Sequence, residues 1–268
     1  MFDRTYQKQY TSANRYKDLV YLFFSLNLWL CVTSVVMVVA TAVALSEPVQ
    51  GVGGGLALPS LLVYAVYVED RRRISDADRI NAPRRTQLVE TYDSLLGLTA
   101  IGALIGYELI LVAFVLEAGT IGLEYVLLGQ VPLIVLALYA TAKRYATFDS
   151  LVVATAWSLS IVLSVLVATG QPISRASVIV FCLWFLIAFA GVESRNIDDI
   201  PGDTALGKRT LAGYLGRKNT RILVVGLKGF ATGLFWYRFG PTVGALVVAH
   251  LLLLWFFRQI TPSESGSQ

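Results

Sequence analysis

The segment ESRNIDDIPGD, residues 193–203, gathers acidic side chains directly after a long apolar run. Asn196, Asp199 and Asp203 are three and four residues apart, so they share one face if this segment is helical. Asp198 would then point in another direction. The spacing predicts a row of oxygen ligands along one side of a helix end.

A second acidic cluster, YVEDRRRISDADRINAPRR, covers residues 67–85 and follows an earlier apolar run. Asp70 and Asp78 are eight residues apart, so they lie on one face, two turns from each other, if the helix continues past the apolar run. Asp76 would point away from that face. This cluster is a candidate partner for the first one.

Carboxylates on two facing helix ends form a hard oxygen environment that suits Mg²⁺ carrying the phosphates of a ligand. Basic residues nearby would supply the positive charge that a departing diphosphate needs. These bases are Arg84, Arg85, Lys143, Arg144, Lys208 and Arg209. The alternative is that both clusters are solvated loops that only fix membrane topology, and spacing alone leaves both readings open.

The elements that position these residues are predicted to be membrane helices. The chain has 268 residues, of which 56% are hydrophobic and 15% charged, with a mean hydropathy of +0.64. Continuous apolar runs of about 17 to 25 residues are typical of helical spans, and no alternation typical of a membrane barrel is present. Eight such runs occur, at 19–46, 52–69, 93–117, 121–142, 149–169, 174–193, 221–236 and 241–257. We therefore expect one all-α membrane domain over 1–268, with a cytoplasmic segment at 1–18 and a disordered tail at 259–268.

The basic residues predict the orientation. With eight spans and the N-terminus inside, nineteen of the 22 Lys and Arg residues fall on the cytoplasmic side and two on the outer side. This bias is the positive-inside pattern of a multi-pass protein of the cell membrane. The basic pI near 9.1 then reflects topology and contact with membrane lipid, so we expect no nucleic-acid partner.

Glu108 and His250 are two of the ionisable residues inside predicted spans. Glu108 lies within the third run, where an ionisable group is expensive and suggests a function, a place near the outer interface or a partner on a neighbouring helix. The single histidine, His250, is expected to be a helix-packing or lipid-facing residue.

The sequence of the second charged loop, RNIDDIPGDTALGKRTLAGYLG, resembles the second aspartate motif of the UbiA superfamily of intramembrane prenyltransferases. In that family, paired aspartates four residues apart are followed by Gly, two basic residues, Thr and Leu. Asp199 and Asp203 occupy the paired positions, and Lys208 and Arg209 the basic ones. Asn196 replaces a leading aspartate.

The first cluster is similar to the family's Asn-x-x-x-Asp-x-x-x-Asp motif, which continues as Asn-x-Pro-x-Arg. Asp78, Asn81 and Arg85 match its later part. Asp70 occupies the asparagine position, and Ile74 replaces the middle aspartate.

A third segment, LYATAKRYATFD, resembles a family pattern of a tyrosine followed four residues later by Lys-Arg. Tyr139, Lys143 and Arg144 match it. The three resemblances follow the second, fourth and sixth runs, in the order that the family has them.

The resemblance implies a helical bundle around a lipid-accessible cavity. Its members typically have nine spans, so a terminal helix is missing here or one long run hides a break. The activity implied is transfer of a polyprenyl group from its diphosphate to a lipophilic acceptor, which would be a quinone precursor, a carotenoid or a lipid. Mg²⁺ would assist ionisation of the allylic carbon–oxygen bond.

The resemblance also implies roles for particular residues. Asp70, Asp78, Asp199 and Asp203 would bind the metal and diphosphate, with Tyr139 near the leaving oxygen. The diphosphate contacts would be Asn81, Arg85, Lys143, Arg144, Asn196, Lys208 and Arg209. Ile74 motivates the alternative, a catalytically impaired member that binds isoprenoids or assists assembly. A small transporter is a weaker third possibility, because inverted repeats and broken midplane helices are not evident.

Overall fold

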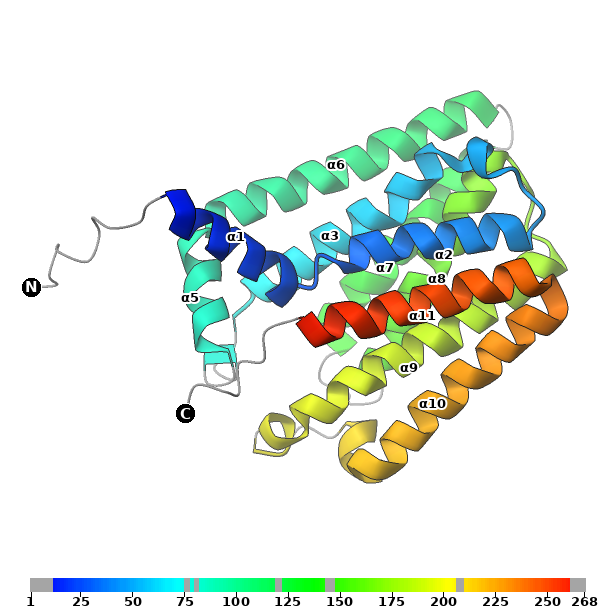
Figure 1. Cartoon of the computed structure of the whole chain (residues 1–268). Coiled ribbons are helices and arrows are strands. Elements are labelled where there is room, and N and C mark those ends of the chain that lie inside the picture. Colours follow the sequence, from blue (N-terminus) through cyan, green and yellow to red (C-terminus); the bar gives the residue numbers. More distant parts are fainter. Residues whose placement is uncertain are drawn as a thin grey trace, which may run out of the picture.

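The computed structural model is a bundle of long α-helices (Figure 1). It describes residues 12–74, 78–79, 82–118, 122–142, 148–205 and 210–260, and no strand occurs among them. The helices are α1 (Ser12–Ser25), α2 (Leu30–Ala44), α3 (Ala57–Arg72), α5 (Pro83–Thr91), α6 (Asp93–Ala118), α7 (Gly122–Ala142), α8 (Phe148–Thr169), α9 (Arg175–Ala205), α10 (Leu211–Phe239) and α11 (Pro241–Ile260). Two short 3₁₀ turns, Val49–Val52 and Gly54–Leu56, precede α3.

Each predicted apolar run coincides with one of these helices, except that the first run is divided between α1 and α2. The expectation of an all-helical membrane bundle is therefore confirmed. The predicted number of eight spans is not confirmed. Among the described residues, five helices are long and apolar enough to cross a membrane, or six if α1 and α2 form one bent span. Of the remaining two runs, the second forms α3, which has 16 residues, and the fourth forms α7, which has 21 residues.

The first apolar run is broken at Asn27. This residue has a left-handed backbone, with φ of 59°, which Asn tolerates better than most residues. The helical segments on its two sides meet at an angle of 50°. The run does hide a break, but the two pieces together count as at most one span.

Glycine lets the chain before α3 approach α8 closely. A Cβ on Gly55 would lie 2.8 Å from the carbonyl oxygen of Ser164, and a Cβ on Gly54 would lie 2.5 Å from the Phe114 ring. These contacts exclude a larger residue, so the glycine-rich sequence at 51–55 serves close packing.

Trp184 of α9 is the centre of the main core. Its side chain is fully buried, and its ring centroid lies 5.0 Å from that of Phe235 in α10 and 5.5 Å from that of His250 in α11. Its indole N–H donates a hydrogen bond of 2.8 Å to Thr41 Oγ1 in α2. One side chain thus joins four helices, and His250 proves to be a packing residue.

Glu108 pairs with a neighbouring helix. The Gln130 Nε2 group of α7 donates to Glu108 Oε2 at 2.9 Å, and beside it the Tyr107 hydroxyl donates to the Gly129 carbonyl at 2.7 Å. These bonds join α6 to α7. Glu108 also borders a shallow groove of about 310 Å³ formed by apolar side chains of α6. It lies about 22 Å along the helix from Asp93, so this groove is remote from the acidic clusters.

We expect Trp184→Ala to lower the free energy of unfolding by about 3 to 5 kcal/mol, because it leaves a cavity where four helices meet and removes the donor to Thr41. Thermal or denaturant unfolding of the purified protein in detergent measures this. The matched control is Trp255→Ala, since Trp255 is 62% exposed on α11 and its loss should cost less than about 1 kcal/mol. Equal losses in the two variants would contradict the central place given to Trp184.

Candidate functional site

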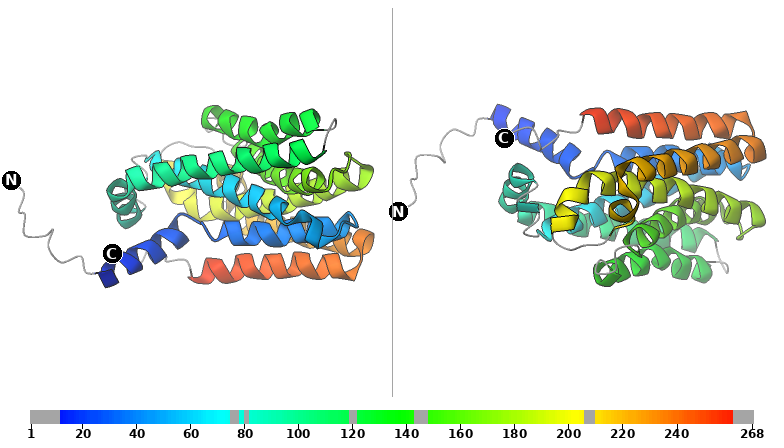
Figure 2. Two further views of the ribbon diagram at one scale, coloured as in Figure 1. Left: turned by 90° about the horizontal axis from the view of Figure 1, so that it is seen from above. Right: turned by 90° about the horizontal axis from the view of Figure 1, so that it is seen from below.

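The two acidic clusters lie at the same end of the bundle. In Figures 1 and 2, the end of α3, all of α5, the end of α9, the start of α10 and the end of α11 gather there, with α1 beside them. We call this region the acidic end. The alternation of the long helices places both charged connections on it, as the sequence predicts.

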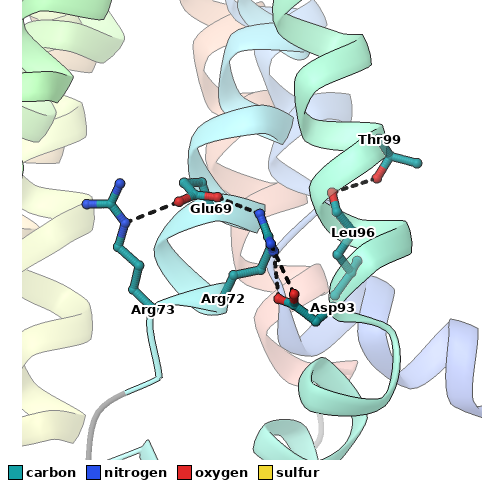
Figure 3. A network of polar contacts seen from close by, with 6 residues as sticks. All are labelled: Glu69, Arg72, Arg73, Asp93, Leu96 and Thr99. Atoms are coloured by element: carbon teal, nitrogen blue, oxygen red, sulfur yellow. Dashed lines mark hydrogen bonds and ion pairs between the residues drawn. The ribbon is translucent and has the colours of Figure 1, made fainter.

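The first cluster is anchored by Arg72 in the last turn of α3 (Figure 3). Its guanidinium binds both carboxylate oxygens of Asp93 at the start of α6, at 2.8 and 3.1 Å, and also Glu69 at 2.9 Å. Two parallel N–H···O bonds fix both the position and the angle of the Asp93 carboxylate relative to the guanidinium. Glu69 binds Arg73 as well, at 3.2 Å. This network ties the end of α3 to α6, across the connection that carries the first motif.

Asp70 and Asp78 do not lie on one continuous helix. The helix α3 ends at Arg72, because Arg73 has non-helical backbone angles. Asp78 lies beyond this end, where Arg85 of α5 binds its carboxylate at 2.8 Å and Arg71 lies 3.9 Å from it. The shared face expected from a continuous helix is therefore wrong. The structure instead joins Asp78, a predicted metal ligand, directly to Arg85, a predicted diphosphate contact.

Ile74 has a structural role. It packs against an apolar cluster of α1, α3, α5 and α6 that contains Tyr21, Val68, Leu88 and Leu96. The position where the resembling family has its middle aspartate is thus occupied by a side chain that helps to hold the acidic end together. It contributes no oxygen ligand.

The second cluster lies on the last turns of α9. This helix continues to Ala205, so Asn196, Asp199 and Asp203 share a face, as their spacing predicts. Asp198 points the other way and forms an ion pair with Arg258 of α11. Arg258 also binds the hydroxyl and the carbonyl of Ser194. The helix phase therefore separates Asp198, which joins α9 to α11, from the row of Asn196, Asp199 and Asp203.

Glu193 is a buried acid to which the sequence gave no role. It is 1% exposed, and its Oε1 accepts a hydrogen bond of 2.5 Å from the Ser150 hydroxyl of α8, which is also fully buried. The Asn196 amide nitrogen lies 3.2 Å from Ser150 Oγ and 3.4 Å from Glu193 Oε1. The available signal was an ionisable residue in the last apolar turn of a span, with a serine at the start of the span before it.

Arg195 lies between aromatic rings at the acidic end. Its guanidinium carbon is 6.0 Å from the ring centroid of Trp29 and 5.8 Å from that of Tyr67. Trp29 in turn stacks on Phe257 of α11, with centroids 5.4 Å apart. Cation–π contacts of this kind hold a positive charge in place without neutralising it.

Several predicted site residues lie outside the described residues. These are Asn81, Lys143, Arg144, Lys208 and Arg209, together with the side chain of Tyr139 in α7. Their roles stay predictions. Of the predicted aspartates, Asp199 is exposed, while Asp70, Asp78 and Asp203 are partly buried.

The oxygen ligands of the acidic end fit Mg²⁺ by their chemistry. Within the described residues, no three His, Cys, Asp or Glu side chains converge as they would in a metal site made by protein alone. Mg²⁺ is usually held by one or two carboxylates plus waters and the phosphates of a substrate. The carboxylates of the acidic end thus match a metal that arrives with its diphosphate better than a preformed metal cage.

Comparison with known proteins bears on the family. No curated protein and no solved structure matches the chain. A sequence model described as the UbiA prenyltransferase family matches residues 96–267. This match contains the second aspartate motif and Tyr139, and it begins after the first motif. Since it covers more than half of the chain, and since the folded helices bring both acid-bearing connections to one end, the chain belongs to the UbiA prenyltransferase family.

Proposed function

We propose that this protein transfers a polyprenyl group from a polyprenyl diphosphate to a lipophilic acceptor within the membrane. The observation that carries the proposal is the gathering of two acid-bearing helix ends at one end of a bundle that belongs to a prenyltransferase family. The charged diphosphate would bind at the acidic end, and the hydrocarbon chain would extend among the helices. The positive-inside pattern supports a cytoplasmic location for the acidic end.

In the proposed reaction, the bond between the allylic carbon and the diphosphate oxygen breaks, and the diphosphate leaves with the electron pair. The acceptor then forms a bond to the same carbon and releases a proton. Enzymes of this family generally use Mg²⁺ with diphosphate substrates, and Mg²⁺ here would neutralise charge on the leaving group. The acceptor would be a quinone precursor, a carotenoid or a lipid.

The aspartates and bases have separate roles in this proposal. Asp199 and Asp203 on α9 would act together with Asp70 and Asp78 of the first cluster as ligands of the metal and diphosphate. Arg85 can hold Asp78 and a diphosphate oxygen together, because a guanidinium carries five N–H donors. The remaining diphosphate contacts would be Asn81, Lys143, Arg144, Lys208 and Arg209, with Tyr139 near the leaving oxygen and Asn196 assisting the aspartates.

Ile74 favours a second candidate function. Because it packs into an apolar cluster, the first motif has one oxygen ligand fewer than the resembling family. A catalytically impaired member could still bind isoprenoids or assist assembly in the membrane. Binding of a long prenyl lipid without Mg²⁺, together with no diphosphate release on any acceptor, would favour this function over catalysis.

We expect Asp199→Ala and Asp203→Ala each to lower the rate of diphosphate release from a long allylic diphosphate by about a hundredfold or more, because each removes charge stabilisation at the leaving group. The matched control is Asp198→Ala. Asp198 lies on the same turn of α9 but binds Arg258, so its loss should leave the rate within about threefold. Full turnover in both Asp199→Ala and Asp203→Ala would rule out the proposed site.

Removing divalent metal with a chelator is expected to abolish diphosphate release, and adding Mg²⁺ should restore it. Among the described residues, no three acids converge on one metal position, so the diphosphate would supply the remaining ligands of Mg²⁺. A metal ion held in this way should exchange readily with solution. Release that continues undiminished in chelator would show that the bases alone stabilise the leaving group.

A further inference from the structure

Glu193, Ser150 and Asn196 form a hydrogen-bonded trio in which Glu193 and Ser150 are buried and Asn196 is partly buried. Ser150 and Glu193 are 0% and 1% exposed, and they join α8 to α9. Asn196 lies one turn after Glu193 and one turn before Asp199. The trio therefore links the packed interior of the bundle to the proposed site.

The hydrogen bonds of the trio fix the orientation of the Asn196 amide. The Ser150 hydroxyl donates its one hydrogen to Glu193 Oε1, so the Ser150 oxygen can only accept from Asn196, and the amide atom against it is the NH₂ group. The Nδ2 atom has distances of 3.4 Å to Glu193 Oε1 and 3.2 Å to Ser150 Oγ. The reverse orientation would place two acceptors against each other. The carbonyl oxygen Oδ1 is consequently turned away from Glu193 and Ser150.

Burial of Glu193 between two helices has a free-energy cost. A buried carboxylate loses its hydration, and its second oxygen, Oε2, has no hydrogen-bond partner among the described residues. An apolar side chain of similar length would join α8 and α9 without that penalty. The buried acid therefore contributes something other than stability.

We propose that Glu193 is a positioning residue that, with Ser150, holds Asn196 so that its Oδ1 serves as a neutral oxygen ligand of the Mg²⁺–diphosphate beside Asp199 and Asp203. Asn196 then acts as an acceptor toward the metal and not as an N–H donor toward the diphosphate. Residues behind a metal ligand commonly orient it in this way. This inference rests on the proposed function.

The test is equilibrium binding of Mg²⁺ with inorganic pyrophosphate to the full-length protein, followed as the rise in thermal unfolding temperature during a Mg²⁺ titration. Glu193→Met removes the acceptor but keeps the length of the side chain. In the Glu193→Met variant, the Mg²⁺ concentration at the midpoint of the titration should rise about tenfold or more. The unfolding temperature of this variant without ligand should stay equal to or above that of the wild type. Glu193→Gln keeps an acceptor oxygen and should bind within about threefold of the wild type.

The coupling to Asn196 distinguishes positioning from a direct role. Asn196→Ala should weaken binding, and adding Glu193→Met to it should weaken binding no further, because Glu193 acts through Asn196. Ser158→Ala is the control, since Ser158 is equally buried on α8 but binds only Ala154 of its own helix. It should leave the midpoint unchanged.

Three results would overturn the inference. The first is a Glu193→Met midpoint equal to that of the wild type. The second is losses that add in the Glu193→Met/Asn196→Ala variant. The third is a Glu193→Met protein that loses ligand binding only because it unfolds at a lower temperature. Wild-type protein that neither binds Mg²⁺–pyrophosphate nor releases diphosphate would instead remove the proposed function itself, and the inference with it.

Discussion

Hydrocarbon does not solvate charge, and this constraint shapes the whole molecule. A charged side chain in the bilayer core is expensive, so acids and bases collect where helices leave the membrane. Because the long helices alternate in direction, the charged connections after α3 and α9 meet at one end. The same constraint explains why the polar side chains that do lie deeper, such as Glu108 and Glu193, are hydrogen-bonded to a neighbouring helix.

The acidic end is held by polar contacts whose partners come from different helices. Arg72 binds Asp93 across α3 and α6, Arg85 binds Asp78 across the first connection, and Arg258 binds α9 from α11. The apolar cluster around Ile74 lies beneath the first of these. The helix ends that carry the acidic clusters are thereby joined to their neighbours by contacts within the protein. Such a frame is the kind of preorganisation that the proposed transfer reaction would depend on.

The periodicity of the sequence predicted more of this structure than its local motifs did. The apolar runs located every long helix, and the spacing of Asn196, Asp199 and Asp203 placed them correctly on one face of α9. The shared face of Asp70 and Asp78 was wrong, because the end of α3 is decided by the backbone at Arg73 and by the packing of Ile74, which are tertiary effects. Glu193 was missed for a similar reason. Its partner Ser150 is 43 residues away, and a contact across helices leaves no mark on the local sequence.

The bonds from Arg258 to Ser194 and Asp198 also bear on the order in which the protein is built. The helix α11 follows all the other described helices, yet it packs against α2, and its Phe257 stacks on Trp29 near the start of the chain. The acidic end thus combines segments that lie far apart in the sequence. During synthesis, the contacts of Arg258 with α9 and of Phe257 with Trp29 cannot form until α11 has followed α10 into the membrane, so this part of the acidic end assembles later than the packing of α2 against α3.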